Sequence, residues 1–153
     1  MPNYKSHLFA AVCTFLIIFT IFLYKKVTLF VGAQLLLCLV LGALFPDIDT
    51  KSKGQKIFYR LFFAVLILLF VKHRFFESAF FALIVFLPLL VKHRGLFHNL
   101  WFVTFVSFVP YFYCSLYMPK YCTSMLLHTV FFVIGIITHL WLDLGLRRMV
   151  RIR

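Results

Sequence analysis

Long, uninterrupted apolar runs are the feature that most constrains the fold of this chain. A transmembrane helix needs about 20 predominantly apolar residues. Here 64% of the 153 residues are hydrophobic and the mean hydropathy is +1.03, which is more apolar surface than a soluble domain of this size can bury. The runs divide into about six stretches of roughly spanning length, near residues 8–24, 27–45, 57–71, 76–91, 99–118 and 123–145.

These runs predict helices rather than strands. They are longer than the roughly 10 residues of a membrane barrel strand, and turn-forming residues are too sparse for a series of hairpins. The first run ends in Tyr24, Lys25 and Lys26 without a small-residue cleavage site, so we expect a retained helix and not a removed signal peptide. The sequence predicts an all-α, polytopic membrane bundle of about six transmembrane helices, forming a single integral-membrane domain over residues 1–153.

The basic residues indicate orientation in a membrane rather than nucleic-acid binding. The net charge is +12, but Lys and Arg lie singly or in small groups at the ends of the apolar runs. With six spans, 11 of the 16 lie on the side of the two termini, and this excess predicts that both termini are cytoplasmic. The chain has no aromatic and basic platform, so no nucleic-acid partner is expected. The five basic residues predicted on the opposite side of the membrane are Lys25, Lys26, Lys72, Arg74 and Lys120.

Four groups of His and Asp residues interrupt the apolar runs, and the predicted topology places all of them at the cytoplasmic end. Only four carboxylates occur in the whole chain, and three belong to this set. A carboxylate at membrane depth costs about 2.5–3.5 kcal/mol and needs a cation or proton as its partner. The set therefore predicts a metal site. Its members are His7, Asp47, Asp49, His93, His98, His139 and Asp143.

The number and kind of these ligands predict more than one ion. Zinc is usually four-coordinate, so seven ligands suggest two or three divalent ions, with Zn²⁺ as the first expectation and Mn²⁺ or Fe²⁺ as alternatives for mixed nitrogen and oxygen ligands. His139 and Asp143 are four residues apart and share one helix face. Each group also has a simpler interpretation: His7 as a surface residue, Asp47 as part of a helix stop, and His139 with Asp143 as a hydrogen-bonded pair.

Two other histidines serve as internal controls. His73 lies in a Val-Lys-His-Arg segment that is repeated around His93, but the predicted topology puts it on the opposite face of the membrane. His128 precedes His139 by 11 residues, which is about 16 Å along a helix. We expect neither of them to be a ligand.

The order of these motifs resembles the YdjM family of membrane-bound, metal-dependent hydrolases, which are also described as LexA-binding inner-membrane proteins. The resemblance extends from His7 to Asp143, and its most specific parts are Pro-Asp-Ile-Asp at 46–49 and His-Arg-Gly-Leu-Phe-His at 93–98. Family members commonly have Thr before the second His and Ser after it, where this chain has Phe97 and Asn99. The motif set is also distantly similar to that of the zinc-dependent phospholipase C and P1 nuclease superfamily, whose helical domains bind three zinc ions and cleave phosphoesters.

This resemblance implies an inner-membrane enzyme that hydrolyses a phosphoester with a metal-activated water. Asp47 or Asp49 could act as the general base. Arg94 could bind phosphate through its guanidinium group, or it could be a positive-inside charge that meets lipid headgroups. A site at the level of the lipid headgroups favours a membrane lipid or a lipid-linked phosphate as the substrate.

Two other classes of function stay open. A metal-ion transporter would need polar groups that continue across the bilayer, and the opposite half of this chain offers few. A non-catalytic metal-binding scaffold or regulatory partner would need a closed coordination shell, whereas this chain has more ligands than one closed shell requires.

Overall fold

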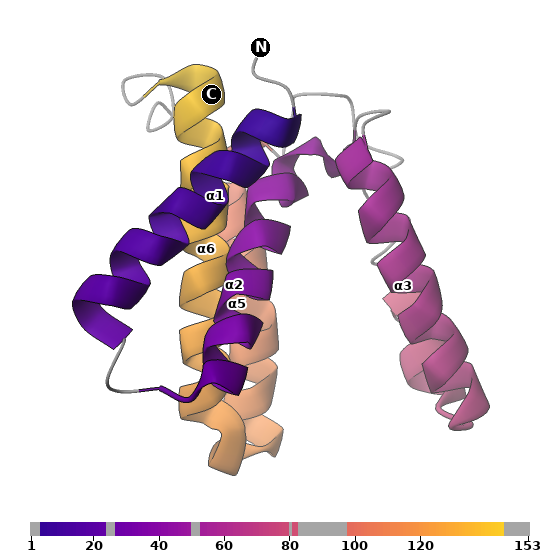
Figure 1. Cartoon of the computed structure of the whole chain (residues 1–153). Coiled ribbons are helices and arrows are strands. Elements are labelled where there is room, and N and C mark those ends of the chain that lie inside the picture. Colours follow the sequence, from indigo (N-terminus) through magenta and orange to yellow (C-terminus); the bar gives the residue numbers. More distant parts are fainter. Residues whose placement is uncertain (1–3, 24–26, 50–52, 80, 83–97, 146–153) are drawn as a thin grey trace.

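The computed structural model describes residues 4–23, 27–49, 53–79, 81–82 and 98–145, and these residues form helices joined by short turns (Figure 1). Five helical segments are long and apolar enough to cross a membrane, so the predicted all-α, polytopic architecture is confirmed. The expected span near 76–91 lies mostly outside the described residues. The five segments are Tyr4–Ile21, Leu29–Ile48, Gly54–Val71, Leu100–Tyr117 and Pro119–Leu144.

Several of the helices change their pitch near their ends. α1 runs into a π-helical segment, α2 runs into a 3-10 helix, and α6 is preceded by a short 3-10 helix. The elements in chain order are α1 (Tyr4–Ile18), η1 (Phe19–Leu23), α2 (Leu29–Leu44), η2 (Phe45–Asp49), α3 (Lys53–Val71), α5 (Leu100–Tyr117), η4 (Pro119–Tyr121) and α6 (Cys122–Leu144).

Figure 1 shows that α2 and α6 run parallel to each other through the middle of the bundle. Four helix termini lie together at one end of the molecule, which is uppermost in the figure. They are the start of α1, the end of α2, the start of α5 and the end of α6. α3 also begins there, in contact with η2, and then stands apart from the other helices. Four chain segments that are distant in the sequence therefore meet at one end of the bundle.

Two apolar clusters hold the helices together. The first joins the ends of α2 and α6 to η2, α3 and α5 at the upper end of the bundle, and the second joins α1 to α2 and α6 further down. The outward faces carry large exposed apolar side chains such as Leu29 and Phe30, as expected for helices that face lipid. The buried members are Leu44, Ile48, Phe58, Val103, Ile136 and Leu140 in the first cluster, and Ala11, Phe15, Leu35, Leu39, Ala43 and Phe131 in the second.

Candidate metal centre

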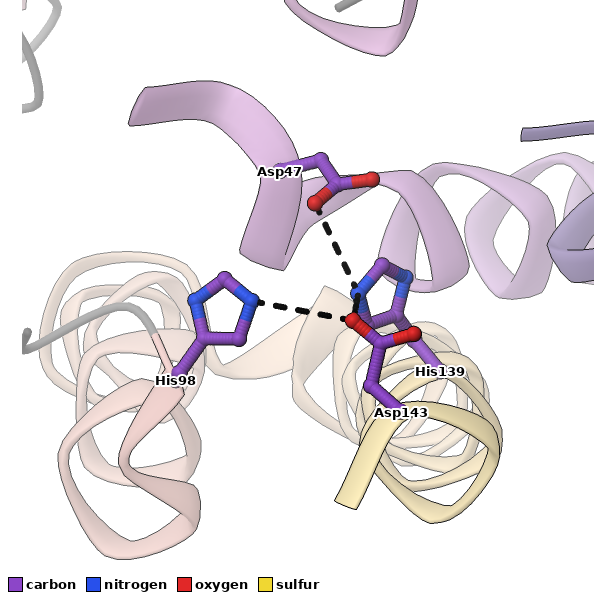
Figure 2. Close-up of side chains that lie close together, drawn as sticks. All are labelled: Asp47, His98, His139 and Asp143. Carbon is purple, nitrogen blue, oxygen red and sulfur yellow. Dashed lines mark ion pairs between the residues drawn. The ribbon is translucent and has the colours of Figure 1, made fainter. Parts of the chain in front are cut away.

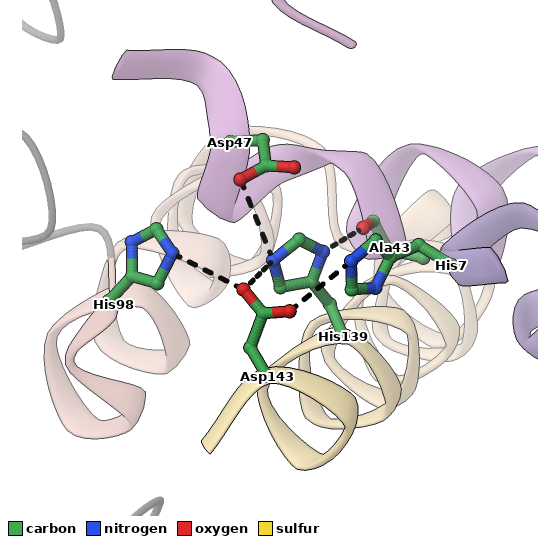
Figure 3. Close-up of polar contacts among 6 residues, drawn as sticks. All are labelled: His7, Ala43, Asp47, His98, His139 and Asp143. Atoms are coloured by element: carbon green, nitrogen blue, oxygen red, sulfur yellow. Dashed lines mark hydrogen bonds and ion pairs between the residues drawn. The ribbon is translucent and has the colours of Figure 1, made fainter. Parts of the chain in front are cut away.

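His139 lies at the centre of the polar cluster, near the end of α6. Its side chain is fully buried, and its Nδ1 donates a hydrogen bond to the backbone carbonyl oxygen of Ala43, 2.6 Å away (Figure 3). A carbonyl oxygen only accepts, so the proton is on Nδ1, and in the neutral ring Nε2 carries a lone pair. Histidines that bind metals are commonly oriented in this way, by a hydrogen bond from the other ring nitrogen.

The sequence at the end of α2 explains why Ala43 can accept this bond. After Leu44 the chain tightens into η2, and in a 3-10 helix each N–H bonds to the carbonyl three residues earlier. The N–H of Phe45 makes such a bond to Gly42. The donor for Ala43 in this pattern would be residue 46, which is a proline without an N–H. The Ala43 carbonyl is therefore left without this 3-10 donor and can accept a bond from the side chain of another helix.

Two carboxylates face the lone pair of His139. Its Nε2 is 3.6 Å from Oδ2 of Asp143 and 3.8 Å from Oδ1 of Asp47 (Figure 2). Nε2 of His98 is 4.0 Å from the same Oδ2 of Asp143. One ligand atom from each of Asp47, His98, His139 and Asp143 lies within 4.8 Å of the other three. These four side chains come from η2, from the residue just before the N-cap of α5 and from the end of α6, and together they could hold a metal ion.

Asp143 connects His7 to this group through its second carboxylate oxygen. Nε2 of His7 lies 3.3 Å from Oδ1 of Asp143. The imidazole ring of His7 also stacks on that of His139, with ring centroids 4.0 Å apart and an angle of 17° between the ring planes (Figure 3). Asp143 thus faces α1 with one oxygen, and His98 and His139 with the other.

The cluster is buried except on one side. The side chains of His7, His98, His139 and Asp143 are at most 7% exposed, whereas that of Asp47 is 22% exposed. Polar groups buried without partners are costly, because they lose their hydrogen bonds to water. Among these five side chains, the described structure leaves Asp47 as the one through which water or a ligand can reach the cluster.

The donor set fits a divalent metal ion. Three buried polar atoms, namely Nε2 of His139, Nδ1 of His7 and Oδ1 of Asp143, have no hydrogen-bond partner within the described part of the chain. In the neutral ring the lone pair of Nε2 is repelled by both carboxylates, and a positive charge between them, either a metal ion or a second proton on the ring, would turn this repulsion into attraction. Zinc binds imidazole nitrogens and carboxylate oxygens at about 2.0–2.2 Å, so modest side-chain movements would close this cluster on an ion.

The remaining predicted site residues cannot be placed in this cluster. His93 and Arg94 lie outside the described residues. Asp49 ends η2, but its side chain also lies outside the described part of the chain. Their assignment as metal ligands (His93 and Asp49) or as catalytic groups (Asp49 and Arg94) stays a prediction.

Both control histidines lie away from the cluster, as expected. His73 is exposed, has a positive φ of 56° and lies in the turn that follows the end of α3. His128 lies further back along α6, where its Nδ1 donates to the carbonyl oxygen of Ser124 at 2.6 Å.

Asn99 has a role that the sequence motifs did not identify. Its side-chain oxygen accepts hydrogen bonds from the backbone N–H groups of Trp101 at 3.0 Å and Phe102 at 3.2 Å, and so caps the start of α5. His98 directly precedes this cap. Serine is an equally good N-cap residue, so the difference from the Ser that is common in the resembled family preserves the local structure that positions His98.

The comparisons with known proteins identify the family of the chain. A family model described as YdjM inner membrane protein matches residues 1–151. No curated protein and no solved structure matches the chain, and the distant similarity to the phospholipase C and P1 nuclease superfamily stays a prediction. The match covers nearly the whole of a multi-pass, helical chain. The protein therefore belongs to the YdjM family of inner membrane proteins.

Proposed function

We propose that this protein is a membrane-embedded, metal-dependent hydrolase that cleaves a phosphoester of a lipid or lipid-linked substrate. The observation that carries the proposal is the orientation of His139. Its Nδ1 is held by the Ala43 carbonyl, so its Nε2 lone pair faces two carboxylates in a buried environment. This arrangement suits a bound cation and is costly without one.

The two oxygens of Asp143 support a centre of two ions. Oδ2 faces His139 and His98, while Oδ1 faces His7 at 3.3 Å without accepting a hydrogen bond among the described residues. Two ligands of one ion are commonly separated by about 3 to 3.5 Å, because each metal–ligand bond is about 2.0–2.2 Å long. In this proposal Asp143 would supply a ligand oxygen toward His7 and another toward His98 and His139, and the predicted ligands Asp49 and His93 would complete the centre. The ions would be Zn²⁺ or alternatively Mn²⁺ or Fe²⁺.

The residues of the chain would act on the phosphoester as follows. When bound, divalent ions lower the pKa of a coordinated water and neutralise charge on the phosphoryl oxygens. The water oxygen forms a bond to phosphorus while the bond from phosphorus to the leaving ester oxygen breaks. Asp47 or Asp49 accepts the proton from the water and returns it to the leaving oxygen, and Arg94 binds the phosphoryl group.

The partial exposure of Asp47 supports a catalytic over a purely structural centre. A structural zinc site is closed by its protein ligands, whereas a catalytic site keeps a position open for water or substrate. The exposed member of this cluster is Asp47, and its carboxylate can also accept a proton. The location among membrane-spanning helices favours a substrate that is itself held in the membrane.

The first experiment measures metal by inductively coupled plasma mass spectrometry on the detergent-purified full chain. Asp143→Ala and His98→Ala remove proposed ligands. His128→Ala, in the same helix as Asp143, and His73→Ala are matched controls. We expect stoichiometric metal in the wild type and both controls and a loss of metal in the first two variants. The loaded protein should then release phosphate from phosphatidic acid in vesicles, and Asp143→Ala should not.

Two results would contradict parts of this proposal separately. A folded wild type that takes up no Zn²⁺, Mn²⁺ or Fe²⁺ would remove the metal centre and with it the mechanism. A metal-loaded wild type that hydrolyses neither phosphomonoesters nor phosphodiesters would leave the metal site intact and would favour a transporter or a non-catalytic scaffold instead.

A further inference from the structure

The only two tryptophans of the chain lie next to the metal centre in the sequence. Trp101 follows His98 by three residues, and Trp141 lies between His139 and Asp143. Both are therefore within about one helical turn of a proposed ligand, since a turn has 3.6 residues. The metal ligands and the tryptophans are at the same height along the bundle.

Both tryptophan side chains point out of the bundle. Trp101 is 58% exposed and Trp141 is 53% exposed, while their neighbours Val103 and Leu140 are fully buried. On α6, Trp141 is two residues from His139, about 200° around the helix axis, so the indole and the ligand lie on opposite faces. Within the described part of the chain, neither indole N–H has a hydrogen-bond acceptor. An indole of this kind can place its ring in lipid and its N–H among headgroups.

Exposed tyrosines form a second band at the opposite end of α5 and α6. Tyr113, Tyr117 and Tyr121 are 57%, 69% and 57% exposed. Trp141 follows Tyr121 by 20 residues, which corresponds to about 30 Å of helix and equals the thickness of a bilayer's hydrocarbon core. Tyr and Trp are enriched at both membrane–water interfaces. The spacing of the two aromatic bands along α6 therefore fits the two surfaces of the hydrocarbon layer.

Between the two bands the exposed side chains of α5 and α6 are apolar, apart from Thr123 and Ser124 beside Tyr121. On α5, Phe105 and Val109 are 70% and 48% exposed, and on α6, Val130 and Ile137 are 38% and 36% exposed. Such surfaces are stable in contact with acyl chains and unfavourable in contact with water. This belt and the aromatic bands agree on one position of the bundle along the membrane normal.

We infer that Trp101 and Trp141 hold the metal centre at the plane of the lipid phosphates of one leaflet, so that its substrate is a phosphate attached to a membrane anchor within that leaflet. The inferred depth of the metal centre rests on the aromatic bands alone, whereas the inferred class of substrate rests also on the proposed function. A phosphate at this depth reaches the ions without leaving the bilayer, whereas a soluble phosphoester has to enter the headgroup layer.

Because the chain has two tryptophans, its intrinsic fluorescence reports the depth of these two positions. The full-length protein is reconstituted into phosphatidylcholine vesicles whose acyl chains carry bromine either close to the headgroup or close to the bilayer midplane. Trp101→Phe and Trp141→Phe each leave one tryptophan. We expect bromine close to the headgroup to quench both single-tryptophan proteins several-fold more than bromine at the midplane, and to a similar degree. Stronger quenching from the midplane for either tryptophan, or no quenching at all, would overturn the inferred depth.

A second measurement separates the two sources of phosphate. Phosphate release is compared between phosphatidic acid in vesicles and glycerol 3-phosphate in solution, which share the phosphomonoester group. We expect release from the lipid to be at least tenfold faster at equal total concentration. Equal or faster hydrolysis of the soluble ester would overturn the leaflet substrate. Shallow quenching without hydrolysis of either ester would sustain the depth and reject the proposed function.

Discussion

Gly42 of α2 and Gly135 of α6 lie against each other where the two parallel helices touch. A Cβ atom on Gly135 would lie 2.1 Å from the carbonyl oxygen of Leu39 and 3.0 Å from the carbonyl carbon of Gly42. A Cβ atom on Gly42 would lie 2.0 Å from the carbonyl oxygen of Phe132. Small residues allow membrane helices to pack backbone to backbone in this way. Gly42 directly precedes Ala43, and Gly135 lies one helical turn before His139, so this contact sets the separation of α2 and α6 at the candidate metal centre.

Gly42→Ala and Gly135→Ala should each destabilise the bundle and impair metal binding at the candidate metal centre. The added methyl group meets backbone atoms that cannot rotate away, so α2 and α6 have to separate. We expect a loss of about 3 kcal/mol, at the upper end of what overpacking usually costs. A thermal unfolding assay in detergent, combined with metal analysis of the fraction that stays folded, measures both effects.

Gly32→Ala is the matched control for this change, because it lies in the same helix. A Cβ atom there would meet the ring of Phe19 at 3.0 Å, and this side chain can shift. Its unfolding temperature should stay close to that of the wild type. An equal loss of stability in all three variants would show that the contact between α2 and α6 is not special.

Asp143→Asn should abolish the stabilisation of the protein by metal, and the variant should keep the fold. Asparagine has nearly the same shape as aspartate but lacks the charge and one of the two acceptor oxygens that face His7, His98 and His139. At a metal concentration 100 times its dissociation constant, binding stabilises the folded state by about 2.7 kcal/mol. We expect the unfolding temperature of the wild type to rise with metal and fall with a chelator, and that of the variant to respond to neither. A variant that responds like the wild type would exclude Asp143 as a ligand.

His7→Ala should remove one ion and leave the other. His7 contacts Oδ1 of Asp143, whereas His98 and His139 face Oδ2. Metal analysis should therefore find one ion per chain less than in the wild type, with the helical circular dichroism signal unchanged. His128→Ala controls for the loss of a histidine from the bundle. An unchanged metal content in His7→Ala would assign His7 a role in orienting Asp143 and would contradict its role as a ligand.

Asn99→Ala should weaken metal binding from a position that is not a ligand. The change removes both hydrogen bonds that cap α5, at a cost of about 1 kcal/mol, and it loosens the backbone that holds His98. Asn99→Ser keeps a capping oxygen and should retain metal affinity close to that of the wild type. Isothermal titration calorimetry with Zn²⁺ compares the three proteins, and equal affinities for all of them would separate the cap from the metal centre.

Much of the architecture can be read from the sequence because the bilayer imposes simple rules on composition. Apolar runs of spanning length have to form helices, since lipid offers no hydrogen-bond partners to the backbone. The number of crossings then decides which polar residues share a side. This reasoning placed Asp47, His98, His139 and Asp143 at one end of the bundle, where the structure brings them together, and it separated His73 and His128 from them.

The tertiary structure decided how these side chains meet. No sequence pattern reports that the backbone carbonyl of Ala43 orients His139, or that His7 stacks on His139 and approaches Asp143 from α1, because these contacts depend on how three helices are rotated and translated against one another. The apolar runs are hydrophobic on nearly every face, so their periodicity does not reveal which face is buried. That choice is made by packing, and above all by the two glycines that let α2 and α6 touch.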